Sequence, residues 1–372
     1  EVDNAATPLK DFEPGQLIEL QSQRGRWLGY GYVNPHSLIC ARLVSRDRKH
    51  PMSPALWVRR IGAALDLRRR LYARPFYRLV FSESDGLPGL VVDRYGDALV
   101  VQITTLGMEV QRADLLAALE QVVRPRAMLL RNDIPVRELE GLPLSNETLL
   151  GEVADRVELE ENGVRFLVSL WWGQKTGWFY DQAENRTRML RYVVGKRVLD
   201  LCAYVGAWGV QAAVKGASEA VCVDLSGQAL ARLEENAALN GVSNKVRALR
   251  GDAFETLRRL EADGERFDLV ILDPPAFIKR RRDLEAGRQA YRRLNRLGLR
   301  LLGGDGLLVT SSCSFHMGRE EFLRTVQRAA SQTGRTLQLL ESGQQGPDHP
   351  VHPAIPETAY LKTLFLRVLP EF

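Results

Sequence analysis

Residues 197–209 have the sequence Arg197-Val198-Leu199-Asp200-Leu201-Cys202-Ala203-Tyr204-Val205-Gly206-Ala207-Trp208-Gly209. An apolar strand pattern leads into a turn that contains glycine, and a helical pattern follows it. Glycine lets the backbone come close to a ligand at the N-terminus of a helix. The turn lacks the spacing G-x-G-x-x-G of dinucleotide-binding folds, so we expect a ligand without a pyrophosphate at this point.

Strand and helix patterns alternate from Val194 onward, which predicts a doubly wound parallel sheet and an α/β fold class. Ligands of such sheets bind outside the carboxyl ends of the strands. The predicted strands end at Asp200, Asp224, Arg250, Asp273 and Thr310. The functional residues are therefore expected close to these positions.

Two regions precede this sheet. Residues 13–58 contain short strand patterns broken by turns, which predict a small β-barrel module that lacks its first strand. Further strand patterns surround one helical pattern downstream, and the pair Asn162-Gly163 fits the type I′ turn of a hairpin. The predicted domains are 1–58 (β-barrel), 59–74 (helical linker), 75–170 (central α+β domain) and 171–372 (parallel sheet).

The 372-residue chain is long enough for two or three domains. No apolar stretch reaches the length of a membrane span and no signal peptide is visible, so we expect no membrane partner. The four cysteines show neither CxxC spacing nor a disulfide scaffold, as is typical of a reduced cytoplasm.

The charge balance is basic, with a net charge of +5 and arginine in excess over lysine. The planar guanidinium group binds phosphate in a bidentate manner, so nucleic acid is the expected partner. The run Arg68-Arg69-Arg70 is typical of a solvated helix face. By contrast, Lys279, Arg280, Arg281 and Arg282 follow the Asp273 loop at the expected active edge, and we expect them to bind nucleic acid.

Carboxylates follow the second and third predicted strands. Asp224 lies about 20 residues beyond the glycine turn, where a carboxylate can bind two ribose hydroxyls. Asp252 is placed to accept a hydrogen bond from an adenine amino group. A nucleoside without phosphates beside an acidic strand end predicts S-adenosylmethionine as the cofactor. Cys202 and Cys222 are expected to pack in the core beside it.

Cys313 lies in Ser311-Ser312-Cys313-Ser314, directly after an apolar strand pattern. The segment Asp273-Pro274-Pro275-Ala276-Phe277 follows another buried strand in the same way. A thiol and a rigid acidic loop at one edge of the sheet predict a nucleophile that faces a flat, polar substrate. The alternative is a small apolar core cysteine. The flanking serines favour the nucleophile.

These motifs resemble a known family. From Val198 onward the chain resembles class I S-adenosylmethionine-dependent methyltransferases, with a Rossmann-like doubly wound sheet. Over nearly its whole length it resembles bacterial 23S rRNA 5-methylcytosine methyltransferases that carry an N-terminal PUA domain. The segments that carry the resemblance are 24–29, 32–37, 173–182 with Asn185-Arg186, 273–277, 311–314, Asp348-His349-Pro350-Val351 and Tyr360-Leu361-Lys362.

The resemblance also implies site residues, and the segment 173–186 is expected to close over the cofactor. Trp208 stands where the superfamily usually has glycine. Ala276 stands where the two-cysteine RNA methyltransferases have a second cysteine, so product release must use another group. The residues expected to bind S-adenosylmethionine are Tyr180, Asp181, Gln182, Arg186, Asp200, Cys202, Ala203, Tyr204, Gly206, Asp224, Leu225, Asp252, Ala253 and Asp273.

Carbon 5 of cytosine is a poor nucleophile, and a thiolate that adds to C6 activates it. Cys313 and Asp273 are therefore the expected catalytic residues, with Cys313 as the nucleophile and Asp273 at the base edge near N3 or N4. Phe277 is placed to stack on a flipped base. In the PUA-like module, the residues expected to contact RNA are Arg24, Arg26 and Asn34.

Two alternatives stay open. An enzyme that methylates guanine or amino nitrogens in rRNA can share the Asp-Pro-Pro-aromatic loop, but it needs no cysteine. An RNA-binding ribosome assembly factor could keep the cofactor pocket without turnover. We expect no metal, because Pro350 breaks the helix that would aim His349 and His352 at one ion. The oligomeric state is open, and a homodimer is one option.

Overall fold

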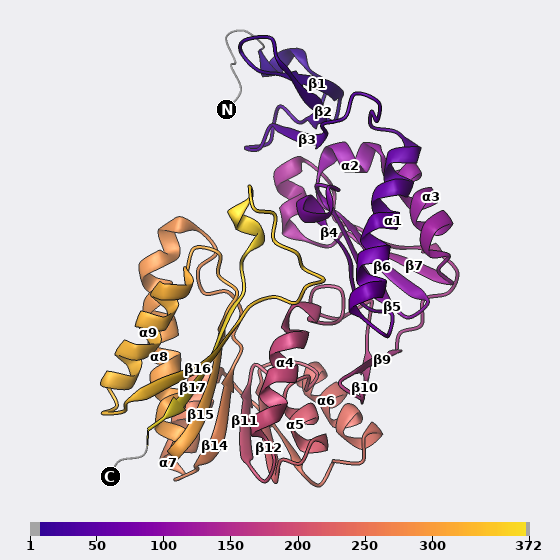
Figure 1. The fold of residues 1–372 in the computed structure, drawn as a ribbon. Coiled ribbons are helices and arrows are strands. Elements are labelled where there is room, and N and C mark those ends of the chain that lie inside the picture. The colour runs from indigo at the N-terminus through magenta and orange to yellow at the C-terminus, as the bar shows by residue number, and fades with distance from the viewer. Residues whose placement is uncertain (1–7, 370–372) are drawn as a thin grey trace. The chain divides into compact units, whose positions relative to one another are not determined.

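The computed structural model describes residues 8–369 (Figure 1). The described chain divides into two compact units. Unit 1 comprises residues 8–157, 169–180 and 347–354, and unit 2 comprises residues 158–168, 181–346 and 355–369. The outermost residues of the predicted domains, 1–7 and 370–372, lie outside the described part.

Unit 1 begins with a short 3-10 helix, η1 (Leu9–Asp11), and a three-stranded antiparallel sheet. Its strands are β1 (Leu17–Gln21), β2 (Trp27–Val33) and β3 (Ala41–Ser45), in the order β1-β2-β3. Tyr32 anchors this sheet to the rest of unit 1, because its buried hydroxyl donates to the Pro88 carbonyl at 2.9 Å. Its ring lies so close to Gly107 that a Cβ there would be 2.1 Å from the ring.

The larger sheet of unit 1 has five strands in the order β4-β5-β6-β7-β8, of which only β6 and β7 pair in parallel. Apolar side chains of α1 (Pro54–Leu71) and α3 (Arg112–Val123) form a buried core with this sheet. The other elements are β4 (Phe76–Phe81), η2 (Ser82–Asp85), β5 (Leu90–Tyr95), β6 (Ala98–Ile103), α2 (Leu106–Val110), β7 (Ala127–Arg131), η3 (Pro135–Glu140) and β8 (Asn146–Leu150).

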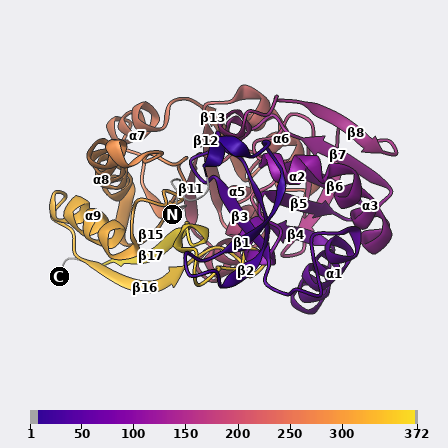
Figure 2. The same cartoon turned by 90° about the horizontal axis from the view of Figure 1, so that it is seen from above.

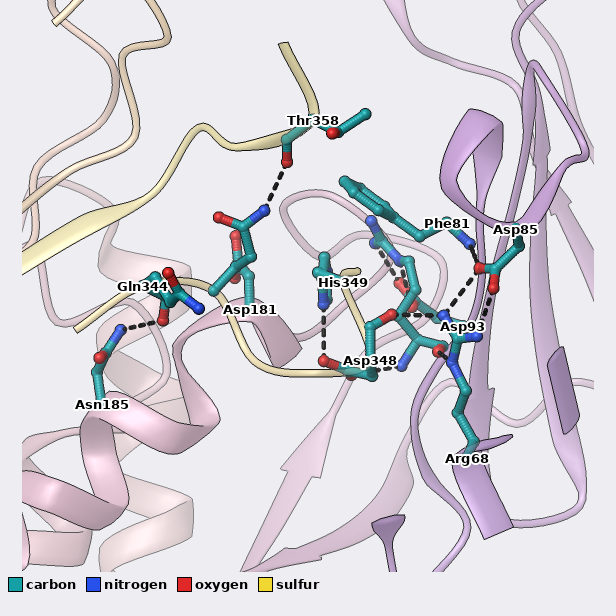
Figure 3. A network of polar contacts seen from close by, with 12 residues as sticks. Arg68, Phe81, Asp85, Asp93, Asp181, Asn185, Gln344, Asp348, His349 and Thr358 are labelled. Carbon is teal, nitrogen blue, oxygen red and sulfur yellow. Dashed lines mark hydrogen bonds and ion pairs between the residues drawn. The ribbon is translucent and has the colours of Figure 1, made fainter. Parts of the chain in front are cut away.

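A buried polar network crosses this core (Figure 3). The guanidinium of Arg68 is fully buried and donates to both carboxylate oxygens of Asp85, at 2.6 and 2.8 Å. It also donates to the main-chain carbonyl of Asp348, whose carboxylate accepts the N–H of Arg78 at 2.8 Å. The prediction that Arg68 belongs to a solvated face is therefore wrong, whereas Arg69 and Arg70 are exposed as predicted.

Unit 2 has a seven-stranded sheet in the order β13-β12-β11-β14-β15-β17-β16, with β17 antiparallel to its neighbours. The first five strands are parallel, so the order reverses between β11 and β14. This confirms the predicted doubly wound α/β sheet. The strands are β11 (Arg197–Leu201), β12 (Glu219–Asp224), β13 (Val246–Arg250), β14 (Phe267–Leu272), β15 (Leu302–Ser312), β16 (Leu337–Gly343) and β17 (Lys362–Val368).

Helices cover both faces of this sheet (Figures 1 and 2). Apolar side chains of α7 (Ala253–Ala262), α8 (Leu284–Leu301) and α9 (Arg319–Ser331) form the core with one face. The opposite face carries α5 (Gly209–Val214) and α6 (Gly227–Leu239). The remaining helical elements are η4 (Tyr180–Gln182), α4 (Ala183–Met189), η5 (Leu190–Tyr192), η6 (Arg281–Asp283) and η7 (Pro356–Thr358).

The predicted hairpin consists of β9 (Val157–Glu161) and β10 (Val164–Val168). Its turn residues Asn162 and Gly163 both have positive φ, as a type I′ turn requires. The structure groups residues 158–168 with unit 2, although the domain prediction placed them in the central domain. It conversely groups residues 169–180 and 347–354 with unit 1. No helix in residues 8–369 has the length and hydropathy needed to cross a membrane.

Replacing Arg68 with alanine would leave the buried Asp85 carboxylate without its bidentate partner. We expect the free energy of unfolding to fall by about 3–5 kcal/mol, as for other broken buried ion pairs. Urea denaturation of the full chain measures it. The matched control is Arg70→Ala, an exposed arginine on the same helix, for which we expect a change within about 0.5 kcal/mol. Equal losses in both variants would contradict a structural role for the network.

Candidate functional site

The turn after β11 has a strained backbone at the carboxyl edge of the sheet. Cys202 and Tyr204 have φ values of +65° and +51°, which are uncommon for residues with a side chain. Gly206 has φ +88°, and a Cβ there would lie 2.7 Å from Val210. Only glycine therefore fits at this position, and the turn presents main-chain groups at the edge of the sheet.

Asp200 is fully buried beneath this turn. Its Oδ2 accepts the Gly209 N–H at 2.9 Å, while Oδ1 is buried with no hydrogen-bond donor among the described residues. Burial is the largest cause and raises the pKa of Asp200 to about 7; the Gly209 hydrogen bond lowers this pKa, and the nearby carboxylates of Asp273 and Asp224 raise it. An unsatisfied buried carboxylate oxygen is suited to a cationic ligand group.

Asp224 ends β12, and its carboxylate accepts two main-chain hydrogen bonds. Oδ2 accepts the Tyr204 N–H and Oδ1 accepts the Ser226 N–H, both at 2.9 Å. The next side chain, Leu225, is 68% exposed, which is unusual for leucine at a strand end. The carboxylate is thereby fixed in orientation and keeps lone pairs for a ligand.

Asp252 follows β13 and caps α7. Its Oδ1 accepts the N–H groups of Phe254 and Glu255 at 2.9 and 3.1 Å. This is a sufficient structural reason for an aspartate at this position. Asp252 and Ala253 follow the end of β13, so both border the edge of the sheet where the other carboxylates lie. The Asp252 side chain is exposed and Ala253 is half-buried.

Asp273 follows β14 and is held by two donors from other segments. Its Oδ1 accepts Nε2 of Gln182 at 2.8 Å, and its Oδ2 accepts Nε1 of Trp208 at 3.0 Å. Burial raises the pKa of the Asp273 carboxyl above its usual range. Trp208, noted in the sequence only as a departure from glycine, therefore orients the predicted catalytic carboxylate.

Arg186 supports this arrangement. It is 1% exposed, and its guanidinium donates to both carboxylate oxygens of Glu161, at 2.5 and 2.7 Å. It also lies 5.9 Å from the ring centroid of Trp208. Arg186 thus links the β9–β10 hairpin to the turn after β11, and Glu161 is a site residue that sequence reasoning missed because the strand pattern carries no functional signal.

Cys313 lies directly after β15 and is half-buried, and it forms no disulfide. Because β14 and β15 pair in parallel with Leu272 opposite Thr310, Cys313 lies beside the Asp273 loop. Its Sγ is 4.0 Å from the Pro274 carbonyl oxygen. The structure therefore brings Cys313 and the Asp273 loop together, as predicted.

The other cysteines near this edge differ from Cys313. Cys222 is fully buried and Cys202 is half-buried, and burial raises the pKa of both thiols. A thiol held neutral in this way is a poor nucleophile. Both fit the predicted role in packing.

Several predicted site residues lie elsewhere or make other contacts. Tyr180 belongs to unit 1, where its hydroxyl donates to the Arg94 carbonyl at 2.9 Å. Asp181 and Gln182 belong to unit 2, and Asp181 accepts a hydrogen bond from the Tyr360 hydroxyl at 2.6 Å. Phe277 packs on the ring of Tyr291, with centroids 4.7 Å apart. Its ring therefore already contributes to the core.

The residues predicted to bind RNA fall into two groups. Lys279, Arg280, Arg281 and Arg282 are exposed, and so are Arg24 and Arg26 in the turn between β1 and β2. Asn34 is the exception, because it is 2% exposed and its amide donates to the Glu140 carboxylate at 2.8 Å. The prediction of Asn34 as an RNA contact is therefore corrected to a structural role within unit 1.

Known proteins resemble this chain over nearly its full length. A relative from Erwinia tasmaniensis named Ribosomal RNA large subunit methyltransferase I is 37% identical over 96% of this chain and 91% of its own. A relative of the same name from Klebsiella pneumoniae is 36% identical over 95% and 90%. A solved structure described as a methyltransferase complexed with SAH matches with a TM-score of 0.84 at 23% identity, over 96% of this chain and 92% of its own.

Two family models match as well. Residues 1–46 match a PUA-like domain, and residues 138–367 match the S-adenosylmethionine-dependent methyltransferases. The orphaned oxygen of Asp200 and the oriented carboxylate of Asp224 fit a nucleoside that carries an amino acid, as this cofactor does. The family recognised from the sequence is confirmed: this chain belongs to the S-adenosylmethionine-dependent methyltransferases and carries a PUA-like domain at its N-terminus.

Proposed function

We propose that this chain methylates carbon 5 of a cytosine in the RNA of the large ribosomal subunit, with Cys313 as the covalent nucleophile. The observation that carries the proposal is the position of Cys313, a half-buried thiol beside the Asp273 loop on the neighbouring strand. The names of the relatives support ribosomal RNA as the substrate. Such a substrate would place the activity in the cytoplasm.

The cofactor would occupy the edge formed by β11, β12 and β13. S-adenosylmethionine supplies an electrophilic methyl group on a positively charged sulfur. Asp200 would accept a hydrogen bond from the ammonium of its methionine part. Asp224 would accept hydrogen bonds from the two ribose hydroxyls. Asp252 and Ala253, with the exposed Leu225, would border the adenine.

On the base side, the thiolate of Cys313 would add to C6, which makes C5 nucleophilic toward the methyl group. Asp273 would hold the base edge at N3 or N4. Burial raises the pKa of Asp273, which favours sharing of a proton between its carboxyl and N3 as negative charge develops on the base. Loss of the C5 proton and release of the thiolate would then restore the ring.

RNA would be held outside this pocket by the exposed basic residues. Phosphate contacts position a nucleic acid but carry little sequence information, so bases are selected within the pocket itself. The run 279–282 directly follows the Asp273 loop and is the basic group adjacent to the site within unit 2. Arg24 and Arg26 of the PUA-like module would contribute further phosphate contacts.

Replacing Cys313 with alanine should abolish methyl transfer and leave the affinity for S-adenosylhomocysteine nearly unchanged, since the thiol is not part of the turn after β11. Transfer of a tritiated methyl group to rRNA and calorimetry with S-adenosylhomocysteine measure the two quantities. Cys40→Ala is the control, because Cys40 lies in unit 1 outside the site. Retained turnover in Cys313→Ala would refute the cytosine mechanism and favour methylation of a nitrogen.

Affinity for S-adenosylhomocysteine should rise with pH between 6 and 8. The free Asp200 carboxyl has a pKa of about 7, so it is mostly protonated at pH 6 and mostly ionised at pH 8, and only the ionised form pairs with the ligand ammonium. We expect a change of roughly tenfold across this range. Calorimetry at several pH values measures it.

The control for this pH dependence is Asp200→Asn, which cannot ionise. This variant should bind more weakly, and its affinity should show a flat profile between pH 6 and 8. An identical pH profile in both proteins would mean that Asp200 does not face the ligand ammonium.

Neutralising Arg280, Arg281 and Arg282 to alanine should weaken RNA binding and flatten its dependence on salt, since fewer counterions are released. Binding titrations at several salt concentrations measure the slope. The matched control replaces Arg258, Arg259 and Arg266, which are also exposed; the first two lie in the second half of α7, and Arg266 directly precedes β14. An equal change of slope in both triple variants would indicate a general effect of net charge rather than a local RNA path.

A further inference from the structure

Lys362 is a buried cation next to the proposed nucleophile. It is the first residue of β17, and it pairs with Ser312, the last residue of β15. Cys313 is therefore the first residue after the neighbouring strand. The Lys362 side chain is only 6% exposed, although lysine is almost never buried without a partner.

The contacts of Lys362 hold it at this position without neutralising it. Its Nζ donates to the main-chain carbonyls of Ser314 at 2.6 Å and Tyr360 at 2.8 Å. Within residues 8–369, no ion pair joins it to a carboxylate. An ammonium has three donors, so one remains after these two bonds. A buried charge of this kind needs a compensating anion.

The Cys313 thiolate can supply this anion. Burial lowers the pKa of Lys362 to about 8, and the interaction with Cys313 opposes this shift. The effect is mutual, because a thiolate that favours the ammonium form of lysine is itself favoured by that ammonium.

We infer that Lys362 is a positioning residue whose ammonium keeps Cys313 in the thiolate form. This inference rests on the proposed role of Cys313. The thiol proton leaves to solvent water, and the sulfur keeps the electron pair that would form the bond to C6. The same ammonium fixes the Ser314 and Tyr360 carbonyls and so orients the loop that carries the sulfur.

The other charged and titratable groups that face this pair come from different elements. Arg319, at the start of α9, interacts unfavourably with the Lys362 ammonium. Tyr291 of α8 bonds the Ser314 hydroxyl at 2.9 Å, and burial raises the pKa of its phenol, so it stays neutral. The loop itself also contains His316. Among these groups, Lys362 is the buried cation adjacent to the thiol.

The reactivity of Cys313 toward iodoacetamide tests the inference without methyl transfer. Alkylation is followed from pH 5.5 to 9.5 in a Cys40→Ser background, and the peptide containing Cys313 is quantified by mass spectrometry. Lys362→Gln removes the charge but keeps donors for the two carbonyls, and Lys362→Arg keeps the charge. Lys196→Met, an exposed lysine on unit 2, is the control.

We expect Lys362→Gln to raise the midpoint of the alkylation profile by about one pH unit or more, with a roughly tenfold or greater loss of rate at pH 7. Lys362→Arg should stay close to the unaltered protein, as should Lys196→Met. Binding of S-adenosylhomocysteine verifies folding, and Lys362→Met replaces Lys362→Gln if that variant does not bind.

An unchanged midpoint in a folded, uncharged variant would overturn the inference, and so would an equal shift in Lys362→Arg. Either result would mean that Lys362 only holds the loop in position and does not stabilise the thiolate. Failure of the proposed function is a separate outcome, because retained methyl transfer in Cys313→Ala would refute the nucleophile whatever the alkylation profile of Lys362 variants shows.

Discussion

The Asp273 carboxylate joins three segments that are far apart in the sequence. Gln182 comes from the segment before the sheet, Trp208 comes from the turn after β11, and Asp273 itself follows β14. A half-buried carboxylate needs hydrogen-bond donors to replace the water it has lost, so each segment depends on the others for its position. The edge of the sheet is thereby organised before any ligand is considered. It holds two carboxyls, Asp200 and Asp273, whose pKa values are raised by burial.

In unit 1, too, buried charged groups need hydrogen-bond partners, and a buried ion pair supplies them. The Arg68–Asp85 pair is buried against β4, and Asp348 inserts its carbonyl and carboxylate into the same network. His349 then packs on Phe81, with ring centroids 5.0 Å apart (Figure 3). The motif Asp348-His349-Pro350-Val351, one of the segments that carry the family resemblance, therefore has a structural function in unit 1, because Asp348 supplies hydrogen-bond acceptors to Arg68 and Arg78.

The surroundings of Cys313 show how packing can set chemistry. The serines that flank the thiol are engaged: Ser314 accepts the Ile278 N–H and bonds Tyr291, and Ser311 bonds Thr363. The ammonium of Lys362 donates to the main-chain carbonyl of Ser314, the residue that follows the thiol. Two hydrogen bonds to main-chain carbonyls fix the position of this ammonium, as preorganised electrostatics requires.

The sequence by itself determined the elements and their order. Apolar periodicity located the carboxyl ends of β11, β12, β13, β14 and β15 to within two residues, because a polar residue at or next to the end of each strand interrupts the apolar run. The Asn162-Gly163 turn was equally clear, since positive φ at both positions restricts the residue types. Cys313 and Asp273 were placed together because strands of one parallel sheet end at one edge.

Only the tertiary structure decided which partner each buried polar group has. Arg68 and Arg70 look alike in the sequence, yet one is buried on Asp85 and the other is exposed. Likewise, Asn34 is satisfied by Glu140 and Trp208 by Asp273. Local patterns report burial and secondary structure, because these depend on neighbours along the chain. The partner of a buried charge lies tens or hundreds of residues away, and its identity follows from packing alone.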